Sequence, residues 1–159
     1  MVINKIQNKI KKIQIILTDV DGVLTDGGRY YSENGESLKK FHVRDGMGVN
    51  ILLRNGIKTI IITKENSKIT KKWAKDMNVT KVISGSLKKE NELIKICKTF
   101  NLSPTQIAYI GDDVNDIGLL KKVGFSATTN DADNMIKEHV DYVCTKNGGN
   151  WAFREISDR

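Results

Sequence analysis

The chain has 159 residues, of which 39% are hydrophobic and 28% are charged, a composition typical of one folded domain over residues 1–159 rather than of a disordered segment. Its net charge is +7, but the lysines are scattered without interleaved aromatic residues, which argues against a nucleic-acid partner. No apolar run approaches membrane-spanning length and the first residues contain no signal-peptide core, so we expect a cytoplasmic protein with no membrane partner.

Short apolar runs rich in isoleucine and valine recur along the chain, each bounded by turn residues. Such runs are typical of strands buried on both faces of a parallel sheet. Helical patterns separate most of them, which favours an α/β fold with a doubly wound parallel sheet. In chain order, the expected elements cover residues 13–17 (strand), 49–55 (helix), 59–62 (strand), 67–77 (helix), 81–83 (strand), 89–100 (helix), 107–110 (strand), 115–123 (helix), 124–127 (strand) and 142–144 (strand).

Residues 28–43, GRYYSENGESLKKFHV, interrupt this alternation after the first strand. Strand-like residues flank Asn34 and Gly35, and Asn-Gly is a strong signal for a hairpin turn. We therefore expect a β-hairpin insertion at about residues 28–43. The insertion after the first strand has room only for this hairpin and the second crossover is short, so we expect no cap domain.

Polar side chains follow three of the expected strands and open one of the expected helices. In open α/β sheets, ligands bind at the carboxyl ends of the strands. If the sheet is parallel, these ends share one edge and bring together carboxylates, a hydroxyl group and a lysine. The residues are Asp19 and Asp21 after the first strand, Thr63 after the second, Asp112, Asp113 and Asp116 after the fourth, and Lys88 and Lys89 at the start of the helix that follows Gly85.

Carboxylates at close range cannot all stay ionised without a positive counter-charge. A hard divalent cation supplies one, and Mg²⁺ fits best because it binds one or two carboxylates together with waters and phosphate oxygens. The two histidines, His42 and His139, stand alone, and the two cysteines lack the spacing of a zinc site. With a threonine and a lysine nearby, the cluster predicts a site for phosphoryl transfer.

The segments DVDGVLTDG, IIT and YIGDDVND, with a lysine after the third strand, resemble the four motifs of the haloacid dehalogenase superfamily of phosphatases. The resemblance runs from Ile15 to about Glu155. Longer stretches such as GVLTDGGRYYSENGE and KKFHVRDGMGV resemble its small capless members. That group includes phosphatases of 3-deoxy-D-manno-octulosonate 8-phosphate, an intermediate of lipopolysaccharide biosynthesis, phosphatases of nonulosonate (sialic acid-like) 9-phosphates, and the phosphatase-like tail of some CMP-sialate synthetases.

The resemblance implies a role for each matching residue. Asp19 is expected to be the nucleophile that forms an aspartyl-phosphate, and Asp21 the acid and base that protonates the leaving group and then activates water. The Asp19 carboxylate, the Asp21 backbone carbonyl and the Asp112 carboxylate are expected to bind Mg²⁺. Thr63 and Lys89 are expected to hold the phosphoryl oxygens.

Other residues are expected to contact the sugar acid or to support the metal site. The substrate stays open, because two positions differ from the pattern of many octulosonate enzymes. The second motif there reads Thr-Gly-Arg, whereas here it reads Thr63-Lys64-Glu65-Asn66, closer to the nonulosonate branch; Trp73 stands where an arginine is common. The residues assigned to the substrate or to support of the site are Asp113, Asp116, Arg44, Asp45, Glu65 and Arg154, the last in its own site or a neighbour's.

The resemblance also implies a homo-oligomer, a tetramer, in which the hairpin packs between subunits. Tyr30, Tyr31 and Phe41 suit such an interface, because a monomer would leave aromatic side chains exposed. The alternative is that these side chains pack on their own domain.

Three other readings of the acidic cluster compete with a phosphatase. A receiver-type signalling module also combines acids, Mg²⁺, threonine and lysine, but its phospho-acceptor ends a middle strand rather than the first. A non-catalytic partner domain of a sugar-acid cytidylyltransferase would have no physical reason to keep Asp19, Asp21, Lys89 and Asp112 together. A phosphomutase would require a cap domain to retain its intermediate.

Overall fold

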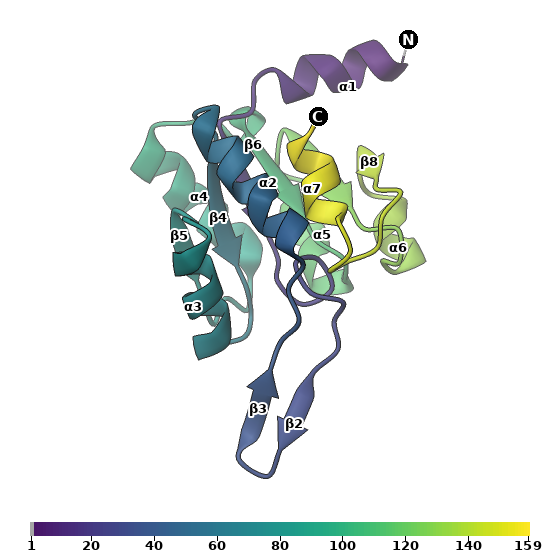
Figure 1. The fold of residues 1–159 in the computed structure, drawn as a ribbon. Helices are drawn as coiled ribbons and strands as arrows, with labels where there is room; N and C mark the ends of the chain where they lie inside the picture. The colour runs from purple at the N-terminus through teal and green to yellow at the C-terminus, as the bar shows by residue number, and fades with distance from the viewer. Residues whose placement is uncertain (1) are drawn as a thin grey trace.

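A computed structural model of the protein describes residues 2–159, with a central parallel sheet between two layers of helices (Figure 1). The strand order is β5-β4-β1-β6-β7-β8, and all five neighbouring pairs are parallel. This is the predicted doubly wound α/β sheet. Its strands are β1 (Ile15–Thr18), β4 (Lys58–Ile62), β5 (Lys81–Ile83), β6 (Ile107–Ile110), β7 (Phe125–Thr128) and β8 (Tyr142–Val143).

Successive residues of the central strands point to opposite layers, and most of these residues are apolar. Ile16 packs in the layer formed by α2, α3 and α7, against which α1 also packs, whereas Ile15 and Leu17 pack in the layer formed by α4, α5 and α6. Burial on both faces explains why the strands read as continuous apolar runs. The helices are α1 (Val2–Ile10), α2 (Val43–Arg54), α3 (Lys68–Asp76), α4 (Lys89–Phe100), α5 (Ile117–Leu120), α6 (Asn134–Lys137) and α7 (Ala152–Ser157).

Five helical segments differ from the sequence-based expectation. Helix α2 begins at Val43 rather than at residue 49, because His42 caps it by accepting a hydrogen bond from the Arg44 amide. The helix expected over residues 115–123 is a 3₁₀ turn (Val114–Asp116) followed by the short α5. Helices α1, α6 and α7 were not expected; α6 and α7 are too short to show a repeated apolar period.

The predicted hairpin leaves the sheet after β1 and extends away from the body of the protein (Figure 1). Its strands are β2 (Tyr30–Ser32) and β3 (Gly35–Leu38), which pair antiparallel. Ser32 pairs with Gly35, so the two-residue loop is Glu33-Asn34, one residue earlier than the Asn-Gly signal indicates. Within residues 2–159 no cap domain is present, and none of the helices is long and apolar enough to cross a membrane.

Candidate active site

Asp19 continues β1 at the edge of the sheet where all the parallel strands end. Its amide donates to the Ile110 carbonyl oxygen (3.1 Å), which extends the pairing of β1 with β6 by one residue. The carboxylate is nearly buried and is held on both oxygens: Oδ1 accepts from the Val20 amide (2.7 Å) and Oδ2 lies 2.6 Å from Lys89 Nζ. Burial raises the pKa of Asp19 to about 6, against the opposing effect of the Lys89 charge.

Lys89, the first residue of α4, is only 1% exposed, whereas Lys88 beside it is exposed. Its Nζ lies 2.6 Å from Asp19 Oδ2 and 2.7 Å from Asp116 Oδ1. A buried ammonium group requires partners of this kind, because desolvation of an unpaired charge is costly. The structure therefore places Lys89, the lysine chosen in the sequence analysis, in the acidic cluster.

Asp116 is fully buried, and four donors occupy its two oxygens. Oδ1 accepts from Lys89 and from the Tyr109 hydroxyl (2.5 Å), and Oδ2 accepts from the amides of Asp112 (2.9 Å) and Asp113 (3.2 Å). With its hydrogen-bonding capacity filled, Asp116 orients Lys89 and the loop after β6. Tyr109 was missed by sequence reasoning; a tyrosine inside an apolar strand is the available signal, because a buried hydroxyl needs a partner.

Asp112 supplies the observation that points to a metal ion. Its Oδ1 is buried and has no hydrogen-bond partner among the described residues. Burial and the charges of Asp19 and Asp116 raise its pKa to about 8. One carboxylate oxygen from each of these three residues lies within 4.8 Å of the others. An unpartnered carboxylate oxygen among like charges fits a divalent cation with oxygen ligands, such as Mg²⁺.

A glycine allows this approach of two loops. A Cβ added to Gly22, whose φ is +90°, would lie 1.8 Å from Asp112 Oδ2. The loop before α7 packs just as closely on the same turn: a Cβ at Gly148 would lie 1.9 Å from the Gly22 carbonyl oxygen, and the Gly149 amide donates to the Val23 carbonyl oxygen (2.8 Å). The turn after β1 is therefore confined between the loop after β6 and the loop before α7.

The carboxylate of Asp21 faces the hairpin rather than Lys89. Lys39 Nζ lies 2.5 Å from its Oδ1, and the Thr25 hydroxyl lies 3.4 Å from the same oxygen. Arg29 approaches Oδ2 at 3.5 Å and pairs more closely with Glu65 (3.0 Å). Neither Lys39 nor Arg29 was identified from the sequence.

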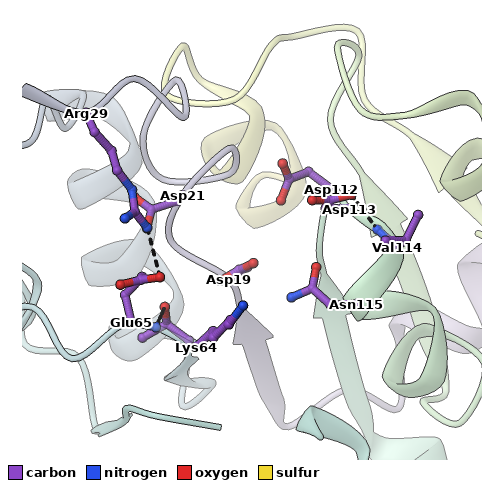
Figure 2. Close-up of a pocket in the computed structure, with 10 residues that line it drawn as sticks. Asp19, Asp21, Arg29, Lys64, Glu65, Asp112, Asp113, Val114 and Asn115 are labelled. Carbon is purple, nitrogen blue, oxygen red and sulfur yellow. Dashed lines mark hydrogen bonds and ion pairs between the residues drawn. The ribbon is translucent and has the colours of Figure 1, made fainter. Parts of the chain in front are cut away.

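A cavity of about 350 Å³ opens at this edge of the sheet (Figure 2). Figure 2 shows the ion pair of Arg29 and Glu65 on one wall, with Asp113 and Asn115 on the other. The Thr63 side chain is nearly buried, and its oxygen accepts from the Glu65 amide (3.2 Å), which leaves its hydroxyl proton free to donate. The cavity is lined by Asp19, Asp21, Arg29, Thr63, Lys64, Glu65, Asp112, Asp113, Val114 and Asn115.

Three residues expected near the substrate do not line this cavity within one chain. Asp45 is buried and accepts from the amides of Trp151 (3.3 Å) and Arg154 (2.9 Å), so it caps the start of α7. The Arg44 guanidinium lies over the Trp151 ring at 3.7 Å, and Arg154 pairs with Asp158 (2.7 Å). Within its own chain, each of the three is engaged with α7 or the residue before it.

Comparison with known proteins identifies the family. Residues 55–150 match the profile of the haloacid dehalogenase-like hydrolases. The chain is 39% identical over 152 residues to the 3-deoxy-D-manno-octulosonate 8-phosphate phosphatase KdsC of Haemophilus influenzae, covering 96% of this chain and 84% of the relative. It is 35% identical over 150 residues to KdsC of Escherichia coli K12, covering 94% and 80%.

Solved structures agree with the sequence comparison. The cobalt-bound octulosonate 8-phosphate phosphatase of Haemophilus influenzae has a TM-score of 0.92 at 39% identity, covering 94% of this chain and 88% of that one. The phosphatase of Moraxella catarrhalis, in complex with magnesium, phosphate and KDO, has a TM-score of 0.94 at 34% identity, covering 98% and 89%. The chain therefore belongs to the haloacid dehalogenase-like hydrolase family, together with these octulosonate phosphate phosphatases.

Proposed function

We propose that this protein is a Mg²⁺-dependent phosphatase that hydrolyses a 2-keto-3-deoxy sugar acid phosphate, of the 3-deoxy-D-manno-octulosonate 8-phosphate type, through an aspartyl-phosphate. The observation that carries the proposal is the buried Lys89 between Asp19 and Asp116, beside the unpartnered oxygen of Asp112. The relatives named as octulosonate 8-phosphate phosphatases, one of them solved with magnesium, phosphate and KDO, support the substrate and the metal.

The reaction divides into two displacements at phosphorus. In the first, an oxygen of the Asp19 carboxylate attacks phosphorus, the bond to the sugar oxygen breaks, and Asp21 gives that oxygen its proton. In the second, Asp21 takes a proton from water as the water oxygen attacks phosphorus, and the bond to Asp19 breaks to release inorganic phosphate. Because the pKa of Asp19 is about 6, its carboxylate is mostly ionised at neutral pH, as a nucleophile must be.

The remaining residues bind and position the phosphoryl group. Thr63 donates its free hydroxyl proton to one phosphoryl oxygen, and the Lys89 ammonium offsets charge on another. Asp19 and Asp112 would hold the Mg²⁺ ion, with the Asp21 backbone carbonyl as the third protein ligand. The metal supplies charge stabilisation to the phosphoryl oxygens. Asp116 supports the loop that carries Asp112 by accepting from the amides of Asp112 and Asp113, and the Asp113 side chain caps the 3₁₀ turn that follows.

A nonulosonate 9-phosphate is the second candidate substrate. The observation that favours it is the Glu65 carboxylate on the cavity wall, paired with Arg29, where an octulosonate enzyme commonly has an arginine. The two candidates differ in the sugar that extends from the phosphate toward this wall, so Glu65 and Arg29 are the residues proposed to distinguish them.

We further propose one phosphatase domain that acts as a homo-oligomer, a tetramer, in the cytoplasm. The hairpin side chains Tyr30, Tyr31 and Leu38 are all more than half exposed, as expected for a surface that a second subunit covers. Phe41, which was also expected there, instead stacks on Trp73 of its own chain with ring centroids 4.5 Å apart. Arg44 and Arg154 would reach a sugar acid only across such an interface. Light scattering after gel filtration should give four times the mass of the chain.

Phosphate release with and without Mg²⁺ tests the function. We expect turnover in Mg²⁺, none in EDTA, and none for Asp19→Asn, which removes the nucleophile while keeping the side-chain shape. Full activity of Asp19→Asn would overturn the mechanism. A comparison of kcat/KM for octulosonate 8-phosphate, a nonulosonate 9-phosphate and glucose 6-phosphate tests the substrate class, and equal values would refute sugar-acid specificity.

A further inference from the structure

The hairpin delivers a buried lysine to the acid and base of the proposed reaction. Lys39 follows β3, and its side chain is 0% exposed. Its Nζ lies 2.5 Å from Asp21 Oδ1 and 3.1 Å from Glu36 Oε1. Asp21 is the proposed acid and base, whereas Lys39 does not line the cavity.

The position of Lys39 is fixed from both sides. Glu36, its second partner, also accepts a hydrogen bond from the Ser67 hydroxyl (3.0 Å), and Ser67 caps the start of α3. A chain of polar contacts therefore runs from α3 through the hairpin to Asp21. A buried ammonium group with two carboxylate partners is costly to displace, because moving it from either one leaves a charge desolvated and unpaired.

The two oxygens of Asp21 have different surroundings. Oδ1 accepts from Lys39 (2.5 Å) and lies 3.4 Å from the Thr25 hydroxyl, which is equally close to the Val20 carbonyl oxygen; neither Lys39 nor Thr25 lines the cavity. Among the described residues, Oδ2 has only the 3.5 Å approach of Arg29, a residue that lines the cavity. The contacts thus fix one oxygen and leave the other on the side of the substrate.

We propose that Lys39 is a positioning residue: it holds Asp21 Oδ1 so that Oδ2 exchanges protons with the leaving group and with water. This inference rests on the proposed function. It makes the hairpin part of the proton-transfer apparatus, since the hairpin cannot move without moving Lys39. If Lys39 only packed the hairpin, replacing it would change the rate equally for leaving groups that need a proton and for those that do not.

Leaving-group dependence tests the proposal. The probes are 3-deoxy-D-manno-octulosonate 8-phosphate, whose alkoxide leaving group needs a proton, and p-nitrophenyl phosphate, whose phenolate does not. For Lys39→Met we expect kcat on the sugar phosphate to fall on the order of 10- to 100-fold with little change in KM, since general acid catalysis contributes about 100-fold or more. The pre-steady-state burst of p-nitrophenolate should stay within about threefold of the wild-type rate.

Two further variants separate positioning from packing. Lys40→Met is the matched control, because Lys40 is 61% exposed and, in the described part of the chain, pairs only with Asp26 at 3.5 Å; the variant should have wild-type kcat and KM. Lys39→Arg should recover part of the lost kcat. If Lys39→Met does not fold, Glu36→Gln, which keeps the pair of Lys39 with Asp21 but weakens its anchor, should show a smaller loss with the same dependence on the leaving group.

The outcomes separate a failure of this inference from a failure of the proposed function. If the wild-type protein hydrolyses neither probe, the proposed function fails. If it is active and the Lys39→Met variant loses rate equally on both probes, changes only KM, or loses nothing, the function stands and the positioning role of Lys39 is overturned.

Discussion

Replacing Lys89 by methionine keeps the apolar stem of the side chain but removes the ammonium group between Asp19 and Asp116. Removing one partner of a buried ion pair costs about 3 to 5 kcal/mol, because the other partner is left charged and desolvated. Asp116 retains its bonds from Tyr109 and from two backbone amides, so we expect about 3 kcal/mol, the lower end of that range. For a chain of this size, such a loss lowers Tm by about 6 to 12 °C.

Thermal and urea unfolding in EDTA, followed by circular dichroism, measure this loss. Lys88→Met is the matched control, because Lys88 precedes Lys89 in sequence and is exposed; it should change the free energy of unfolding by less than about 0.5 kcal/mol. Saturating Mg²⁺ should reduce the difference in free energy of unfolding between Lys89→Met and wild type, because a bound cation offsets the same carboxylate charge.

The loss of stability in Lys89→Met should also depend on pH. At pH 5, below the pKa of about 6 for Asp19, that carboxylate takes up a proton and no longer needs the lysine, so the cost of the substitution shrinks. A loss below about 1 kcal/mol in EDTA at pH 8, or a loss of the same size at pH 5 and pH 8, would refute the argument that Lys89 neutralises this cluster.

Three more predictions concern the metal site and the cap of α7. In EDTA the pKa values of Asp112 (about 8) and Asp19 (about 6) are raised in the folded protein, which therefore binds more protons than the unfolded chain between these values and about pH 4. The free energy of unfolding should therefore fall as pH rises from about 4 to 8, and a rise over that range would contradict the prediction. Gly22→Ala should weaken Mg²⁺ binding, measured by calorimetry, and lower kcat on the order of 10-fold or more, because the added Cβ clashes with Asp112. Gly56→Ala is the control: Gly56 also has a positive φ but has open space around it, so this variant should only lower the free energy of unfolding, by about 1 kcal/mol. Asp45→Ala should lower stability by about 1 to 3 kcal/mol with KM nearly unchanged; a large rise in KM at unchanged stability would instead place Asp45 in a substrate site.

Local sequence was sufficient for the sheet. Residues 107–110 form a strand with the predicted bounds, because an apolar run buried on both faces needs no information from elsewhere in the chain, and residues 81–83 also form a strand with the predicted bounds at the edge of the sheet. Helix α7 is different, since its start is capped by Asp45, which lies far away in sequence. No reading of residues 150–157 alone contains that partner.

The candidate site likewise contains residues that local sequence predicts and residues that only the tertiary structure reveals. Asp19, Thr63 and Asp112 each follow a strand, so the topology rule alone was sufficient to place them at one edge. Lys39 could not be found this way, because Lys39 and Lys40 are adjacent lysines in the same hairpin segment, and only the fold shows that one is buried on Asp21 and the other exposed. Polar contacts that support a site depend on tertiary structure and cannot be predicted from local sequence, whereas residues at strand ends can be predicted from the order of the strands and helices.

The contact of Gly148 and Gly149 with the turn after β1 has a consequence for synthesis of the protein. That turn carries Asp21 and Gly22, yet it is confined by a loop at residues 148–149, which lies far later in the sequence. Domains form in order as the chain leaves the ribosome, but this turn cannot reach its final packing until its partner loop has emerged. The turn after β1 is therefore completed only after residues 148–149 have been synthesised, and a chain that stalls before Gly148 would lack the partner that confines this turn.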